Sequence, residues 1–164
     1  MLKYFIIYLL LILQSGVYCQ LNKDLIGQQE SVQLPRVFMI GEYENLYEKM
    51  MVRYDKPLLY IFNDDLQLAF DAWTEVLLDF EDSAKENGFD LNGLKLWINI
   101  FFNEDGSLQH IVYFPKPNSR HMQYDKLSNF FYQFSSKYRF RDPVSTRCSH
   151  FGSVSFPTFA KRKR

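Results

Sequence analysis

A β-hairpin pattern in the middle of the chain most constrains what this sequence can fold into. Residues 94–102 alternate in a period of two, with a continuous apolar set on one side, as in a half-buried strand. Asp105-Gly106 follows, a dipeptide typical of tight hairpin turns, and residues 108–114 return as the partner strand. Pro115 and Pro117 end the pairing, because proline has no N–H for the ladder. The sequence therefore predicts an antiparallel hairpin.

Three stripes of apolar residues at helical spacing flank this hairpin. Two precede it, in residues 43–54 and 66–84, and the third follows it, in residues 124–138. The members of the second stripe are Leu66, Ala69, Phe70, Trp73, Leu77, Phe80 and Ala84. The run 63–65, Asn-Asp-Asp, predicts an N-cap for this second helix, and Asn87-Gly88 predicts its end. We interpret the stripes as faces that pack into a core.

The C-terminal segment completes the predicted fold. Residues 151–159 are of β type, and Pro157 within them fits only an edge position or the end of a strand. The order helix, helix, hairpin, helix, strand predicts an α+β fold. Its small antiparallel sheet has about three strands, the hairpin plus the C-terminal strand, and its helices pack on one face. Trp97 and Phe101 lie on the second face of the hairpin, so we expect apolar contacts on both faces.

The first 19 residues have the pattern of an export signal. A short positive start, Met1-Leu2-Lys3, precedes ten apolar residues, 4–13, and small residues follow before Cys19. The apolar run is shorter than the roughly 20 residues that a membrane-spanning helix needs. We expect residues 1–19 to be a removable signal peptide, with a retained anchor and lipid attachment at Cys19 as the alternatives. The prediction is a periplasmic or secreted protein without stable membrane insertion after signal removal.

The rest of the chain, 20–164, is predicted to be a single α+β domain. A chain of that length buries enough surface for an independent core. We divide it into an extended arm, 20–40, a helical half, 41–90, a sheet-bearing half, 91–159, and a basic tail, 160–164.

The charges balance overall but are unevenly distributed. Nineteen Lys and Arg residues match nineteen Asp and Glu residues, so we expect no nucleic-acid partner. The acids are concentrated before Leu91 and the bases after it. Two interpretations follow: either the acidic helices pack beside the basic half and their fields cancel, or the basic half meets an acidic partner or a membrane surface.

The residues that could carry chemistry do not form a recognisable catalytic or metal pattern. Cys148 and His150 share one face of a predicted strand, but the sequence implies no acid that would orient the histidine. Structural zinc needs four ligands, and no second pair has suitable spacing. The carboxylates of residues 64–86 are expected on the solvated face of a helix. We therefore predict no catalytic residues, no metal, no cofactor and no enzymatic activity.

A series of short motifs in the second half occurs in a familiar order. They are Gly93, the strand LWINIFF (96–102), Asp105-Gly106, the strand 108–114, Asp125-Lys126-Leu127, Tyr138-Arg139-Phe140, Pro143 and VSFPTF (154–159). In this order they resemble the TonB C-terminal domain family over about residues 84–159. The resemblance implies a TonB-like fold and a protein-binding role, in which a short extended segment of an outer-membrane transporter adds to the sheet edge. The six prolines form no spacer run, so the resemblance points to a soluble relative and not to an energy transducer.

The predicted function is a non-enzymatic protein-interaction domain that binds an envelope or outer-membrane transport partner. The candidate contact residues are Trp97, Phe101, Ser153, Val154, Ser155, Phe156 and Phe159. The alternative is a secreted carrier of a small molecule or lipid, because helices laid over a sheet rich in Phe and Tyr can enclose an aromatic-lined cavity.

Overall fold

The structure, a computed structural model, describes residues 33–142 and 144–162. Those from Leu34 onward form one unit. The predicted export segment, residues 1–19, lies outside the described residues, as do residues 20–32 of the predicted arm. Within the part that is described, no helix is both long enough and apolar enough to cross a membrane.

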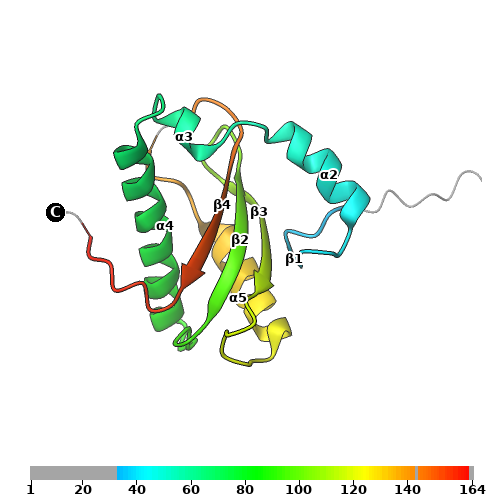
Figure 1. The fold of residues 1–164 in the computed structure, drawn as a ribbon, viewed down its shortest axis with the longest axis vertical. Helices are drawn as coiled ribbons and strands as arrows, with labels where there is room; N and C mark the ends of the chain where they lie inside the picture. The colour runs from blue at the N-terminus through cyan, green and yellow to red at the C-terminus, as the bar shows by residue number, and fades with distance from the viewer. Residues whose placement is uncertain (1–32, 143, 163–164) are drawn as a thin grey trace, which may run out of the picture. The chain divides into compact units, whose positions relative to one another are not determined.

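The described residues form an α+β fold around a four-stranded mixed sheet (Figure 1). The strands are β1 (Val37–Met39), β2 (Lys95–Phe102), β3 (Leu108–Pro115) and β4 (Cys148–Ser155). Their order across the sheet is β1-β3-β2-β4. β2 pairs antiparallel with both β3 and β4, whereas β1 pairs parallel with β3.

The sheet differs from the predicted one by the added strand β1. We expected about three antiparallel strands, and the structure has a fourth that runs parallel to its neighbour. The N–H of Ile111 donates to the carbonyl of Arg36, and the N–H of Ile40 donates to the carbonyl of Tyr113, both at 2.9 Å. Three residues are too few to show a periodic pattern, and only pairing with β3 makes this segment a strand. The prediction of an extended arm therefore missed its role in the sheet.

The turn of the hairpin is built by the Asp-Gly dipeptide that predicted it. An Asp105 carboxylate oxygen accepts hydrogen bonds from the N–H and the hydroxyl of Ser107, at 2.9 and 2.5 Å. Gly106 has a φ of 75°, a left-handed conformation that costs residues with a Cβ free energy.

Four helices accompany the sheet in the described residues. They are α2 (Glu44–Arg53), α3 (Leu58–Ile61), α4 (Leu66–Glu86) and α5 (Tyr124–Lys137). The long helix α4 begins where the capping run predicted it. The Asp65 carboxylate accepts from the N–H groups of Gln67 and Leu68, at 2.9 and 3.0 Å, and so satisfies two donors of the first turn.

The main core lies between the sheet and the two longest helices. Strand β2 contributes alternate residues that are all fully buried, Leu96, Ile98, Ile100 and Phe102. Val76 and Phe80 of α4 and Phe131 of α5 pack against this face and are also fully buried. One layer of helices therefore covers one face of the sheet, as the stripes predicted.

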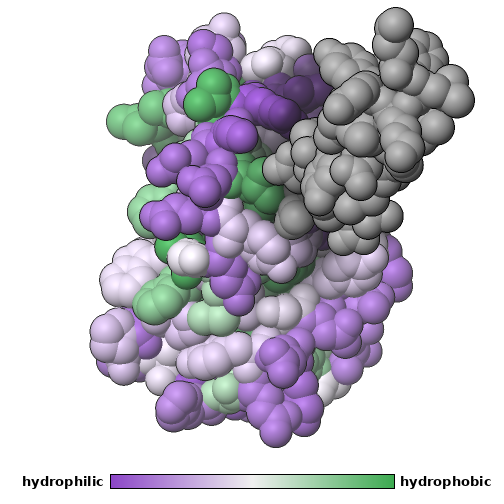
Figure 2. All heavy atoms as spheres, turned by 90° about the vertical axis from the view of Figure 1, so that its right-hand side faces the viewer, coloured by the Kyte–Doolittle hydropathy of each residue, from purple (hydrophilic) through white to green (hydrophobic). Residues whose placement is uncertain are grey.

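A second, smaller core on the opposite face corrects the prediction that the helices pack on one face. It consists of Phe38, Met50, Tyr54, Phe101 and Val112, and it places α2 on the face that α4 and α5 do not cover (Figure 1). The apolar stripe of α2 packs against the apolar second face of the hairpin. Figure 2 looks onto the side that bears α2 and β1, where hydrophilic side chains predominate on the coloured surface and hydrophobic ones form small separate areas.

The acidic surface of α4 binds two arginines from the C-terminal half. Arg141 and Arg162 each form ion pairs with Glu75 and Asp79, at 2.5 to 3.1 Å. Arg162 also pairs with Asp82 at 2.6 Å. This part of the predicted basic tail is therefore held on α4, and here the acidic and basic halves pack against each other.

Candidate functional site

Among the described residues, strand β4 forms one edge of the sheet and presents backbone groups that have no partner there. The N–H of Ser149 donates away from β2 to the carbonyl of Lys56 at 2.9 Å, whereas the N–H of Phe156 donates to Leu94 at 2.8 Å. Because outward and inward positions alternate along an antiparallel strand, Phe151, Ser153 and Ser155 also turn their N–H and C=O groups outward. None of these six groups has a hydrogen-bond partner among residues 33–142 and 144–162.

The open edge is limited at the N-terminal end of β4. Beside Ser149 the connection between α2 and α3 runs along β4, with Pro57 bridged to it in parallel. The Ser149 hydroxyl donates to the carbonyl of Tyr54 at 3.0 Å. The available edge therefore starts at Phe151 and ends at Ser155, where the strand ends.

An apolar hollow adjoins the N-terminal part of this edge. It has a volume of about 590 Å³ and lies between the α2–α3 connection, the first turns of α4 and β4. Leu66, Phe70 and Phe151 line it and are 74%, 64% and 62% exposed. Met51 and Trp73 are also part of its apolar wall. Large apolar side chains gathered around an open strand edge are typical of an interaction surface.

The histidine and cysteine of β4 face the main core. The ring of His150 lies against Trp73, with ring centres 4.2 Å apart, and burial lowers the pKa of His150 to about 4. Cys148 is fully buried, and burial raises the pKa of its thiol to about 12. A thiol with that pKa holds its proton at neutral pH, so it is not an activated nucleophile. In the described ranges, no three His, Cys, Asp or Glu side chains lie close enough to hold a metal ion.

The predicted contact residues divide into exposed and buried sets. Ser153 and Ser155 are exposed on the open edge, and Trp97 is half-buried on the same face. Phe159 is 86% exposed, but it lies beyond the end of β4.

The remaining predicted contacts belong to the two cores. Phe101 is fully buried beneath α2, where the rings of Tyr47 and Tyr54 lie 6.3 and 5.3 Å from its own. Val154 and Phe156 are each 3% exposed and pack in the main core. These three side chains leave no surface for a partner, because the second face of the hairpin is covered by α2 and the even-numbered residues of β4 point inward.

The residues that the sequence analysis missed are Leu66, Phe70 and Phe151. Leu66 and Phe70 fall in the second helical stripe and were expected in the core, but Leu66 is the first residue of α4 and Phe70 lies one turn further, and both are exposed and line the hollow beside β4. Phe151 shares the exposed face with Ser153 by simple alternation, and that pattern was the available signal.

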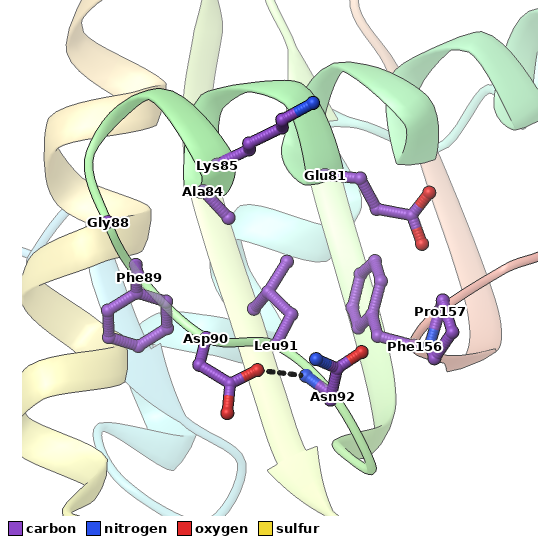
Figure 3. A pocket seen from close by; sticks show the side chains of 10 residues that line it. All are labelled: Glu81, Ala84, Lys85, Gly88, Phe89, Asp90, Leu91, Asn92, Phe156 and Pro157. Carbon is purple, nitrogen blue, oxygen red and sulfur yellow. Dashed lines mark hydrogen bonds between the residues drawn. The ribbon is translucent and has the colours of Figure 1, made fainter.

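A second hollow, of about 390 Å³, lies at the other end of α4 (Figure 3). The side chains of Leu91 and Phe156 point toward the helix, and Lys85 points away from them. The acidic side chains that line this hollow already have hydrogen-bond or ion-pair partners. Glu81 accepts from the N–H and hydroxyl of Thr158, at 2.6 and 3.1 Å, and Asp90 pairs with Arg120 at 2.5 Å. This hollow therefore offers fewer free polar groups than the edge of β4.

Comparison with known protein families, with curated proteins and with solved structures finds no match to this chain. The edge of β4 with the hollow of about 590 Å³ beside it is the candidate functional site.

Proposed function

We propose that this protein is an exported, non-enzymatic interaction domain. It binds an extended segment of an envelope or outer-membrane transport partner, which joins the sheet as a further strand beside β4. The observation that carries the proposal is the edge from Phe151 to Ser155, which no other described residue pairs with, next to an exposed apolar hollow. In this mode of recognition, backbone hydrogen bonds supply affinity and side-chain pockets supply selectivity.

The two parts of the site suit these two tasks. The edge offers alternating donors and acceptors at Phe151, Ser153 and Ser155, each able to contribute about 1 kcal/mol net when paired. The hollow offers Phe70 and Leu66, whose apolar surface leaves water when a partner side chain covers it. A segment that pairs with the edge extends past Phe151 into the hollow.

The TonB-like relationship is part of this proposal. The segment from the end of α4 to β4 runs helix, hairpin, helix and strand, which is the order that the resemblance implies. The final strand lies at the margin of the sheet beside the first strand of the hairpin, as strand addition requires. These features support the proposal through the fold alone. The partner that they suit is an extended peptide segment.

The proposal is tested by titrating the ¹⁵N-labelled chain with extended nine-residue peptides from periplasmic segments of outer-membrane transporters. Binding is expected to shift the amide signals of Phe151, Ser153 and Ser155, whose N–H groups point outward. The signal of Leu127, buried in α5, serves as the internal control and should stay in place. Unchanged signals throughout residues 150–159 would contradict the proposal.

Replacing Ser153 with proline is expected to weaken such binding about tenfold, because one outward donor is lost and the peptide carbonyl opposite it stays unpaired. The pairing with β2 should survive, since the N–H of Ser153 does not point toward β2. Ser153→Ala is the matched control: it loses the same hydroxyl but keeps the N–H. Isothermal titration of both variants measures the difference, and equal affinities would argue against strand addition.

A secreted carrier of a small molecule or lipid is the second candidate function, and the hollow favours it. Its volume of about 590 Å³ and its apolar wall are suited to a small ligand. The hollow is open and lies outside the main core. Native mass spectrometry of the purified chain separates the two functions. A co-purifying ligand of stoichiometric mass supports the carrier, and the bare chain mass together with peptide binding supports the interaction domain.

A further inference from the structure

Lys116 places a positive charge at the open edge of the sheet. It directly follows β3, which is two strands away from β4. Its ammonium group lies over the ring of Trp97 on β2, 5.5 Å from the ring centre, and donates a hydrogen bond to the hydroxyl of Ser153 on β4. The side chain therefore crosses β2 on the face opposite the main core and ends beside the outward-facing residue at the centre of the edge.

A second lysine lies on the same face. Lys95 is the first residue of β2, two positions before Trp97, and its register partner on β4 is Ser155. Neither Lys95 nor Lys116 forms an ion pair with an acid in the described part of the chain. Asp90, at the same end of the sheet, is engaged by Arg120. Of the two lysines, Lys116 therefore reaches β4 and Lys95 lies one strand inside it, and neither has a carboxylate partner among the described residues.

From this arrangement we infer that the segment bound at β4 is acidic on one face and apolar on the other, with a carboxylate opposite Ser153. The inference rests on the proposed function and names the chemistry of its partner. Neighbouring strands lie about 4.8 Å apart, so a residue opposite Ser153 has its side chain within reach of the Lys116 ammonium group.

The residues on either side of that carboxylate point to the other face, because side chains alternate along a strand. On that face they meet the side of β4 that packs against α4, where Trp73 and Phe70 line the hollow. Apolar side chains suit these positions. A segment with an acidic residue opposite Ser153 and apolar residues on either side of it therefore fits both faces at the centre of the edge.

Two seven-residue peptides test the inference, one alternating valine and glutamate and the other alternating valine and lysine. Exposed ion pairs contribute up to about 1 kcal/mol, and like charges cost similar amounts, so we expect the glutamate peptide to bind about five to ten times more tightly. The preference should shrink in 1 M salt, where the screening length is about 3 Å. Affinities come from isothermal titration, and the binding site from the amide signals of residues 151–155.

Variants of Lys116 assign the preference to this residue. Lys116→Met keeps the stem over Trp97 but removes the charge and should reduce the preference to about twofold, and Lys116→Glu should reverse it. Lys126→Met, on the exposed surface of α5, is the matched control and should leave it unchanged. If both peptides shift the β4 signals with equal affinity, the inference is overturned and the proposed function stands. If neither peptide shifts them, strand addition itself is contradicted.

Discussion

Replacing Phe80 with alanine is expected to lower the free energy of unfolding by about 4 kcal/mol. Phe80 is fully buried in the main core, and the rings of Phe131 and Phe134 lie 5.3 and 4.2 Å from its own. Alanine removes the apolar contacts and leaves a cavity between α4 and α5, where large rings fixed on rigid helices cannot collapse fully into the space. Urea unfolding of the chain, followed by circular dichroism, measures the change.

Phe70→Ala on the same helix is the matched control. Phe70 is 64% exposed and lines the hollow, so its loss should change the free energy of unfolding by less than about 0.5 kcal/mol. The same variant should weaken the binding of peptides that enter the hollow. Comparable losses of stability for Phe70→Ala and Phe80→Ala would contradict the division of this apolar stripe into a core part and a surface part.

The division within α4 also shows how far the sequence predicts the fold. The 3.6-residue period, the Asp65 cap and Asn87-Gly88 are local features, and they predicted the start and the end of the helix. Whether a position on the stripe is buried depends on what lies beneath it. Phe80 packs in the main core, whereas Leu66 and Phe70 line the hollow beside β4, and only the tertiary arrangement distinguishes them.

In the sheet, too, the features set by a short stretch of sequence were predicted, and those set by contacts between distant segments were not. The alternation of β2 and the Asp-Gly turn are contained in one short segment, and both were predicted. β1 has three residues and is a strand only through its pairing with β3, so no local pattern indicated it. The packing of α2 on the second face was indicated only in part, through Trp97 and Phe101 on that face of the hairpin.

The candidate site was predicted in its backbone and only in part in its side chains, because Ser153 and Ser155 lie on the edge but the residues of the hollow were not predicted. Pro157 and the β-type residues before it indicated a strand at an edge or an end, and β4 is an edge strand. The hollow is formed by three segments, around Met51, Phe70 and Phe151, that the fold brings together from distant parts of the sequence. The charge at the edge comes from Lys116, two strands away, through a contact that no sequence pattern shows.

Lowering the pH from about 7 to 4 is expected to destabilise the protein by about 3 kcal/mol through His150 alone. Burial against Trp73 lowers the pKa of His150 from 6.5 to about 4 in the folded state. Between these two values the unfolded chain binds a proton that the folded chain does not, so each unit of falling pH costs about 1.4 kcal/mol. The stabilisation is complete above pH 6.5 and is lost as the pH falls toward 4. Urea unfolding at a series of pH values measures this loss.

His150→Phe isolates this contribution, because it keeps a ring against Trp73 but cannot bind a proton. The variant should lose less stability than the wild type over the same pH range, and the difference between the two curves should approach 3 kcal/mol at pH 4. Burial also lowers the pKa of His110, whose Nδ1–H donates to the carbonyl of Pro35 at 2.9 Å, so part of the acid sensitivity remains in the variant. Parallel curves for the wild type and His150→Phe would contradict this prediction. They would mean that folding does not lower the pKa of His150, so that its ring beside Trp73 is open to water.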